Sequence, residues 1–193
     1  MSIYKKDEPS PYDLSNFTVL LVEDSLYMQS LMVSMMKMFG VGDIMVCSNA
    51  QEAIDLLKVT QARRKSRYVT DIDIVVTDWL MPGGSGKDLL NWIRGQDDDN
   101  IRFLPVVVVS AYTTEKLVAM ARDAGANETL VKPISGVGLA SRICCVIDKA
   151  RSFVSISDYF GPDRRRKDAP FNGDDRRVTN PKHIKNKRKK AEG

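Results

Sequence analysis

Short runs of apolar, mostly β-branched residues recur along the first 150 residues, and each has the length of a buried strand. They predict five strands, at Phe17 to Val22, Asp43 to Cys47, Ile72 to Thr77, Pro105 to Ser110 and Glu128 to Val131. Turn residues and polar segments separate the runs, so we expect the strands to belong to one sheet.

The segments between these runs carry apolar residues three and four positions apart, which is the spacing of amphipathic helices. One such segment, Met28 to Phe39, closes at Gly40, and another follows a candidate N-cap at Asn49. Further helices are predicted at Ser85 to Arg94, at Thr113 to Ala124 with Gly125 as its stop, and at Ser135 to about Phe153. Alternating strands and helices predict an α/β fold, a doubly wound parallel sheet with helices on both faces. The polar stretches Arg63 to Asp71 and Gly95 to Asn100 are expected to be solvated loops.

Composition narrows the class of protein. With 193 residues, of which 43% are apolar and 28% charged, the chain can bury one sizeable core and carry an extension. No apolar run is long enough for a membrane helix and the first residues lack a signal-peptide pattern, so we expect a cytoplasmic protein without membrane insertion. Three cysteines and a single histidine, His183, make a disulfide scaffold, a zinc site and histidine-based catalysis improbable.

Charge divides the chain into two unlike parts. Residues 1–150 carry 16 Lys and Arg against 19 Asp and Glu, whereas residues 151–193 carry 13 against 6. An acidic body followed by a basic segment suggests that the segment meets an anion, such as a nucleotide, a nucleic acid, a membrane surface or an acidic protein.

Polar residues stand at the carboxyl ends of the predicted strands, where open parallel sheets bind their ligands. Glu23 and Asp24 follow the first strand, Asp78 the third, Ser110 closes the fourth, and Lys132 comes directly after the fifth. Each residue alone has an ordinary explanation, such as a helix cap or a solvated lysine. The conjunction of all five indicates a site.

The chemistry of these five residues is coherent. Three carboxylates at one edge would repel one another unless a cation lay among them, and hard oxygen ligands suit Mg²⁺. A carboxylate beside Mg²⁺ can attack a phosphoryl group and form an acyl phosphate. The hydroxyl of Ser110 and the ammonium of Lys132 could then contact the phosphoryl oxygens.

The segments LLVEDS, VVTDWLMPGGSG, VVVVSAY and LVKPIS resemble, in order and spacing, the receiver domain of bacterial response regulators, the CheY-like fold, over about Phe17 to Val154. The resemblance implies a five-stranded flavodoxin-like sheet of order 2-1-3-4-5 with five helices. It also implies that Asp78 is the phosphoacceptor, and that Glu23, Asp24, Asp78 and the backbone carbonyl of Leu80 hold Mg²⁺.

By the same resemblance, Ser110 is the switch hydroxyl, Lys132 is the phosphoryl-binding lysine, and Lys132-Pro133 is a cis peptide bond. One position departs from the family pattern. Three residues before the lysine the family often has an aromatic residue that turns inward on activation, whereas this chain has Thr129. The usual aromatic switch is therefore in question for this protein.

A short frame occurs twice in the basic segment. An aromatic residue, Gly, Asp and Arg-Arg recur in YFGPDRR and FNGDDRR, 12 residues apart, at Tyr159 to Arg165 and Phe171 to Arg177. The segment has too few apolar residues to fold alone, so we expect it to be flexible until a ligand binds. The expected organisation is an N-terminal extension at 1–15, a receiver domain at 16–154, an arginine-rich binding segment at 155–180 and a disordered basic tail at 181–193.

The residue types of this frame suit guanine. Arginine pairs bidentately with O6 and N7, aspartate accepts from N1–H and N2–H, and aromatic rings stack on the base. The segment resembles the arginine-rich extension of CheY-like cyclic di-GMP effectors of α-proteobacteria, which implies binding of this messenger, as one molecule or as an intercalated dimer, and a flagellar motor switch partner. The predicted ligand residues are Tyr159, Phe160, Asp163, Arg164, Arg165, Arg166, Phe171, Asp175, Arg176 and Arg177.

Three hypotheses remain open at this stage. In the first, cyclic di-GMP binds the segment and changes what the receiver binds. In the second, a histidine kinase phosphorylates Asp78 and the segment is a charged tether. In the third, the segment binds nucleic acid non-specifically, which the aspartates within both frames disfavour because they would repel phosphate. A solvated linker is the plain alternative for the segment, and nothing indicates an enzyme.

Overall fold

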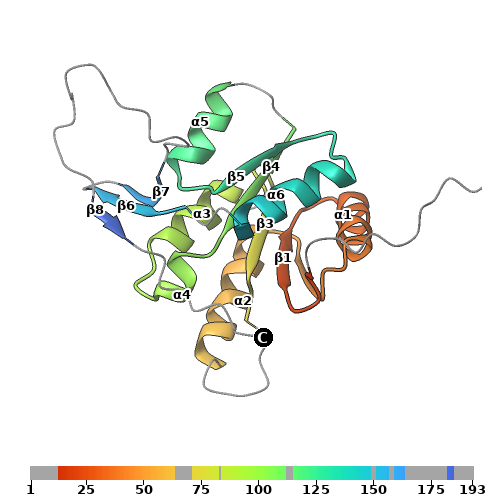
Figure 1. Ribbon diagram of the computed structural model, residues 1–193, viewed down its shortest axis with the longest axis horizontal. Helices are drawn as coiled ribbons and strands as arrows, with labels where there is room; N and C mark the ends of the chain where they lie inside the picture. Colours follow the sequence, from red (N-terminus) through yellow and green to blue (C-terminus); the bar gives the residue numbers. More distant parts are fainter. Residues whose placement is uncertain are drawn as a thin grey trace, which may run out of the picture.

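The computed structural model describes residues 13–63, 71–82, 84–111, 115–148, 151–156 and 159–163, and the backbone of 182–184. Five parallel strands form one sheet in the order β2-β1-β3-β4-β5 (Figure 1). The strands are β1 (Thr18–Val22), β2 (Asp43–Cys47), β3 (Ile74–Asp78), β4 (Val106–Ser110) and β5 (Glu128–Val131). The predicted doubly wound α/β fold is confirmed.

Helices cover both faces of this sheet (Figure 1). They are α1 (Leu26–Met38), α2 (Ala50–Arg63), α3 (Gly86–Arg94), α4 (Asp99–Arg102), α5 (Glu115–Asp123) and α6 (Gly136–Asp148). Met32 of α1 and Leu139 of α6 join one apolar layer, whereas Leu57 of α2, Leu89 of α3 and Ala121 of α5 join the other. Because these apolar layers pack against both faces of the sheet, every residue of β1, β3 and β4 is buried.

The strand register brings the predicted functional positions to one edge. Val22 lies opposite both Cys47 and Thr77, and Asp78 lies opposite Val109. Ser110 in turn pairs with Val131. The residues that close or follow β1, β3, β4 and β5 therefore gather at the carboxyl edge of the sheet.

A second, antiparallel sheet follows the receiver fold. It contains β6 (Phe153–Ile156), β7 (Tyr159–Pro162) and β8 (Lys182–Ile184) in the order β7-β6-β8. The structure corrects the prediction that the last helix runs to about Phe153, because α6 ends at Asp148 and Phe153 begins β6. Phe153 follows the buried Val146 by seven positions, which matches helical periodicity, but its ring is buried by the hairpin instead.

The hairpin of β6 and β7 docks on the receiver. The Phe153 side chain is 1% exposed, and its ring centroid lies 4.7 Å from that of Phe103 and 5.4 Å from that of Phe160. Gly161 lies against Gly125, and a Cβ on Gly161 would come within 2.9 Å of the Gly125 Cα, so the two backbones approach closely. Residues 155, 156 and 159–163 thus belong to the folded structure rather than to a flexible segment.

Two smaller boundaries also differ from the sequence prediction. Leu14, placed in the N-terminal extension, is 4% exposed and packs in the layer beneath α1 and α6. The stretch from Gly95 to Asn100, predicted to be a loop, contains the start of α4, which Asp98 caps by accepting the backbone N–H of Asn100. Most of the polar stretch at 63–71 lies outside the described residues.

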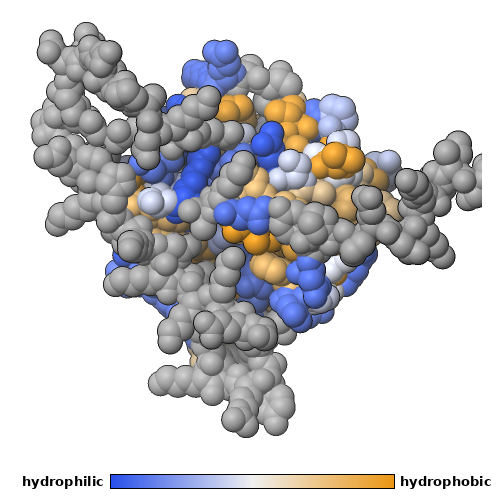
Figure 2. Space-filling view, in the orientation of Figure 1, coloured by the Kyte–Doolittle hydropathy of each residue, from blue (hydrophilic) through white to orange (hydrophobic). Residues whose placement is uncertain are grey.

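The surface combines hydrophilic and apolar patches, and the face shown in Figure 2 has both beside each other. The most exposed large apolar side chains are those of Leu26, Tyr27, Met38 and Val137. Among the described residues, no helix has the length and apolar character to cross a membrane.

Candidate functional site

The first part of the site is the turn between β1 and α1. Glu23 is buried, with 1% exposure, and the neighbouring Asp24 is exposed. Ser25 caps α1 by accepting the backbone N–H of Met28, which fixes where the helix begins. One turn later, the Gln29 amide donates to the Glu23 carbonyl at 2.6 Å. The turn therefore holds two carboxylates at the edge of the sheet.

Asp78 ends β3 beside this turn and is 8% exposed. One carboxylate oxygen each of Glu23, Asp24 and Asp78 lies within 4.8 Å of the others. Asp78 Oδ1 accepts the backbone N–H of Leu80 at 3.2 Å. The α3 residue Gly86 packs against the Asp78 carbonyl so closely that a side chain there would collide with it.

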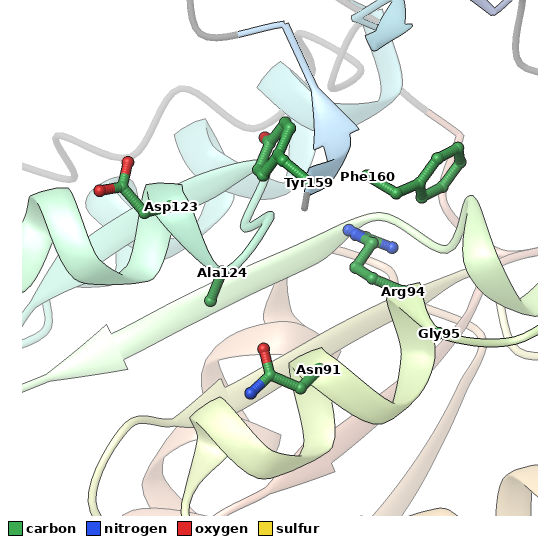
Figure 3. Close-up of a pocket in the computed structure, with 7 residues that line it drawn as sticks. All are labelled: Asn91, Arg94, Gly95, Asp123, Ala124, Tyr159 and Phe160. Atoms are coloured by element: carbon green, nitrogen blue, oxygen red, sulfur yellow. The ribbon is translucent and has the colours of Figure 1, made fainter. Parts of the chain in front are cut away.

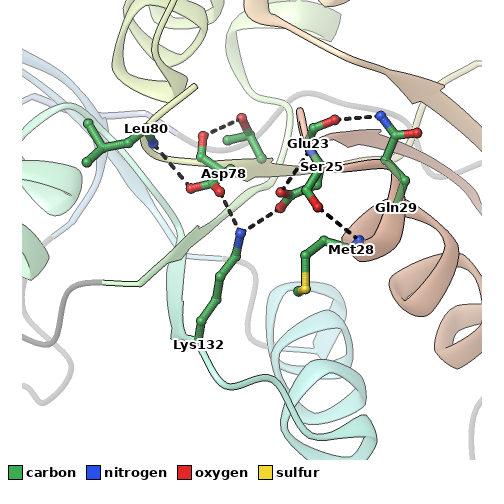
Figure 4. A network of polar contacts seen from close by, with 8 residues as sticks. Glu23, Ser25, Met28, Gln29, Asp78, Leu80 and Lys132 are labelled. Carbon is green, nitrogen blue, oxygen red and sulfur yellow. Dashed lines mark hydrogen bonds and ion pairs between the residues drawn. The ribbon is translucent and has the colours of Figure 1, made fainter. Parts of the chain in front are cut away.

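Lys132 joins the two buried carboxylates. Its Nζ lies 2.8 Å from Glu23 Oε2 and 2.6 Å from Asp78 Oδ2 (Figure 4). The Lys132 backbone N–H donates to the Ser110 carbonyl at 2.8 Å, and the predicted cis bond between Lys132 and Pro133 is present. The side chain of this lysine thus points from the end of β5 across β4 toward β3 and β1.

The charges of the site perturb one another. Burial raises the pKa of Glu23, although the hydrogen bond from Lys132 opposes this, and the nearby charge of Asp78 adds to the increase. Burial lowers the pKa of Lys132, but its hydrogen bonds to Asp78 and Glu23 outweigh that cost and the net shift is upward. The ammonium is therefore held charged between two carboxylates.

The donor set suits a divalent cation. Glu23, Asp24 and Asp78 provide hard oxygen ligands close together, which Mg²⁺ prefers. Among the described residues, these three carboxylates face one ammonium, so negative charge remains for a cation to neutralise. That the Leu80 carbonyl joins these ligands stays a prediction, although Leu80 does lie at the site through its N–H.

Ser110 and Thr129 occupy neighbouring strands beneath the site. Ser110 ends β4 and is 4% exposed. Thr129 is half-buried in β5 and lies opposite Val108, two residue pairs before the pair of Ser110 and Val131. The position where the family often has an aromatic residue is thus filled by a small β-branched side chain.

The residues predicted to bind a nucleotide are only partly described. Asp163 donates its backbone N–H to the Ser152 carbonyl at 2.7 Å, and the Tyr159 hydroxyl donates to the Pro162 carbonyl at 2.9 Å. The ring centroid of Phe160 lies 3.7 Å from the guanidinium carbon of Arg102. The other predicted residues lie outside the described residues: Arg164, Arg165, Arg166, Phe171, Asp175, Arg176 and Arg177.

Sequence reasoning overlooked Arg94, which is a second unusual cation. It ends α3, is 6% exposed, and donates to the carbonyls of Gly125, Arg102 and Leu104 and to Asn127 Oδ1. In the sequence it reads as an ordinary basic residue in the last turn of a helix. No local signal could have shown that these four oxygens surround it.

Comparison with known proteins places these features in context. The family model described as "Response regulator receiver domain" matches residues 19–143. Chemotaxis protein CheY-3 of Vibrio cholerae is 31% identical over 134 residues, which are 69% of this chain and 94% of that protein. Chemotaxis protein CheY of Pseudomonas aeruginosa is 28% identical over 125 residues, 65% of this chain and 91% of that protein.

Solved structures agree with this similarity. A complex of CheX and CheY with BeF₃ and Mg from Borrelia burgdorferi matches with a TM-score of 0.59 and 27% identity, over 68% of this chain and 89% of that one. Chemotaxis response regulator CheY4 of Vibrio cholerae matches with a TM-score of 0.55 and 21% identity, over 67% and 98% of the two chains. The latter match shows the shared fold.

Proposed function

The chain belongs to the response regulator receiver domain family, and we propose that it accepts a phosphoryl group on Asp78 and thereby changes its binding to a protein partner. The observation that carries this proposal is the placement of the Lys132 ammonium between the Glu23 and Asp78 carboxylates, 2.8 and 2.6 Å away. A lysine in this position can bind a phosphoryl oxygen after transfer.

The proposed transfer needs few protein groups. A carboxylate oxygen of Asp78 forms a bond to phosphorus while the bond from phosphorus to the donor's leaving group breaks, so no general base is required. Mg²⁺ held by Glu23, Asp24 and Asp78 would neutralise charge on the transferred oxygens. Lys132 then exchanges its Asp78 contact for a phosphoryl oxygen, and Ser110 at the end of β4 offers a hydroxyl.

The test is phosphorylation of the full chain by acetyl phosphate in the presence of Mg²⁺. Intact-protein mass spectrometry should show one phosphoryl adduct in the wild type and none in Asp78→Asn. Asp88→Asn is the matched control, because Asp88 lies in the exposed first turn of α3 and bonds to Ser85. An adduct of equal yield on Asp78→Asn would contradict the assignment.

The named relatives support a proposal about the partners of this chain. Two relatives are chemotaxis proteins, and the Borrelia burgdorferi complex joins CheY to CheX. We therefore propose a histidine kinase as phosphoryl donor and a flagellar motor switch protein or a similar protein as target, with the receiver acting in the cytoplasm and recruited to the motor. The receiver itself would catalyse only the phosphoryl transfer to its own Asp78, without turnover of another substrate.

Cyclic di-GMP binding by the arginine-rich segment is the second candidate function. The observation that favours it is the duplicated aromatic, Gly, Asp and Arg-Arg frame, which suits two guanines related by symmetry. Bound messenger, as one molecule or an intercalated dimer, would then control what the receiver binds. The arginines of the segment begin at Arg164, two residues after β7 ends, so ligand binding can act on the docked hairpin.

Calorimetry tests this second function. Cyclic di-GMP should bind the wild type and Asp78→Asn equally, and it should not bind a variant in which Arg164, Arg165, Arg176 and Arg177 are alanine. GTP and an oligonucleotide serve as comparison ligands, and equal binding of the oligonucleotide with steep salt dependence would favour nucleic acid instead. Lack of heat with cyclic di-GMP at micromolar concentrations would remove this candidate and leave the phosphorylation proposal intact.

A further inference from the structure

A cleft of about 230 Å³ lies far from Asp78, where the C-terminal ends of α3 and α5 meet β7 (Figure 3). Because these helices run antiparallel to the strands, their C-terminal ends lie at the amino edge of the sheet, opposite the acidic site. Asn91 and Arg94 line the cleft from α3, Asp123 from α5, and Tyr159 and Phe160 from β7. The docked hairpin therefore provides one wall of the cleft.

One wall of the cleft holds a buried positive charge without a carboxylate. All four hydrogen bonds that the Arg94 guanidinium makes to described residues go to neutral oxygens, at 2.8 to 2.9 Å. Burial lowers the pKa of Arg94 to about 9, so the group remains charged at neutral pH. A guanidinium has five N–H groups. One donor is thus left, and a ligand with an acceptor atom would satisfy it.

The remaining walls of the cleft provide hydrogen-bond acceptors and a flat aromatic surface. Asp123 and Asn91 approach from two helices, and the ring of Tyr159 stands between Asp123 and Arg94 in Figure 3. The Tyr159 hydroxyl donates to the Pro162 carbonyl at 2.9 Å, which fixes the ring. The cleft thus combines a donor, an acceptor and an aromatic wall, which suits a planar ligand that has both an acceptor edge and a donor edge.

A neighbouring groove extends the cleft along α3 and α5. It has a volume of about 270 Å³, shares Asn91, Asp123 and Ala124 with the cleft, and adds Lys87 and Met120. The ammonium of Lys87 can pair with an anionic group of a ligand whose flat part occupies the cleft. A base joined to a phosphate has this form.

We propose that this cleft binds the guanine base of a nucleotide, with Arg94 donating its one remaining N–H to O6, Asp123 accepting from N1–H and N2–H, Tyr159 stacking on the ring and Lys87 meeting the phosphate. Guanine is favoured over adenine because adenine places an amino group where guanine has O6, and that group would face the donor of Arg94. The inference rests on the second function above, since it gives one guanine of the messenger a place on the receiver.

The experiment is an NMR titration of the full chain with GMP, AMP and cyclic di-GMP, followed by calorimetry on variants. GMP should shift the amide signals of Asn91, Asp123 and Tyr159 and bind about tenfold more tightly than AMP. Asp123→Asn should weaken GMP and cyclic di-GMP about tenfold, because the amide no longer accepts both protons. Asp55→Asn, an exposed carboxylate on α2, is the matched control and should change neither affinity.

A second variant separates stacking from folding. Tyr159→Phe keeps the ring and should bind as the wild type does, whereas Tyr159→Leu should weaken GMP about tenfold, with an unchanged amide spectrum elsewhere showing that the hairpin is intact. Equal affinity for AMP and GMP would contradict guanine binding in the cleft. So would an unchanged affinity of Asp123→Asn for cyclic di-GMP, if the variant without the four arginines no longer binds this messenger. Either result would leave the second function standing. Failure of the wild type to bind any guanine compound would overturn both.

Discussion

Each of the two edges of the central sheet contains a buried cation, and the two cations have different partners. At the carboxyl edge, Lys132 pairs with the carboxylates of Glu23 and Asp78, and three acidic groups still outnumber it. At the amino edge, Arg94 is more deeply buried and bonds only to neutral oxygens of described residues. The first arrangement leaves negative charge that a metal ion and a phosphoryl group can use. The second uses positive charge to hold together the segments that lead into β4 and β5, and the guanidinium carbon lies 5.2 Å from the centre of the Phe153 ring in the hairpin.

The comparison first predicts where stability resides. Arg94→Met should lower the free energy of unfolding by on the order of 4 kcal/mol, because four oxygens in a buried site lose their donor. Urea denaturation measures this loss. Arg122→Met, on the exposed surface of α5, is the control and should change stability by less than about 0.5 kcal/mol. Comparable effects of the two substitutions would mean that Arg94 is not a structural cation.

The hairpin should make the next largest contribution. Phe153→Ala should cost about 3 kcal/mol, because the ring is 1% exposed and packs on Phe103 and Phe160. The matched aromatic near the acidic site, Tyr27, is 74% exposed, and Tyr27→Ala should cost less than about 0.5 kcal/mol. If Phe153→Ala left the denaturation midpoint unchanged, the hairpin would be an attachment rather than part of the fold.

The two edges also differ in how far the sequence reveals them. Glu23, Asp78, Ser110 and Lys132 follow or close strands, so the alternation of apolar runs and polar stops was enough to place them together. Gly40 and Gly125 were likewise predicted to end helices, and both have positive φ. These features depend on local pattern and on the general geometry of parallel sheets.

The amino edge depends on contacts between segments that are distant in sequence. Phe153 continues the seven-residue spacing of α6, so periodicity favoured a longer helix, whereas in the structure it begins a strand that pairs with β7 and its ring packs on Phe103 and Phe160. Arg94 meets Gly125 and Asn127, which are more than 30 positions away. The pairing of Lys132 with Glu23 was also not foreseen, since 109 positions separate the two residues.

Metal binding should act on the carboxyl edge alone. Mg²⁺ at about 100 times its dissociation constant should raise the free energy of unfolding by about 2.7 kcal/mol, because the ion binds the folded chain and not the unfolded one. Asp78→Asn should remove most of this increase, and thermal denaturation with and without Mg²⁺ measures it. Phe153→Ala, at the other edge, should retain the full increase. A Mg²⁺ response that survives in Asp78→Asn would place the ion elsewhere.

The smallest expected effect is a pH dependence that also belongs to the carboxyl edge. Burial raises the pKa of Glu23 above 4.5, and although the hydrogen bond from Lys132 opposes this, the net shift is upward. A carboxyl group with a higher pKa in the folded state binds its proton more tightly there, so protonation favours folding. The contribution of Glu23 to stability should therefore increase as pH falls through its folded pKa toward 4.5, and be smallest at higher pH.

Without Mg²⁺, the difference in unfolding free energy between wild type and Glu23→Gln should vary with pH in this window, as urea denaturation at a series of pH values would show. Glu115→Gln, an exposed carboxyl on α5, should show no such variation relative to wild type. Saturating Mg²⁺ should shift the dependence to lower pH, because the ion favours the ionised carboxylate just as Lys132 does. If the unfolding free energies of the wild type, Glu23→Gln and Glu115→Gln depended on pH in the same way, Lys132 would fully compensate the effect of burial on Glu23. The carboxyl edge would then carry less excess negative charge than its three acidic groups suggest.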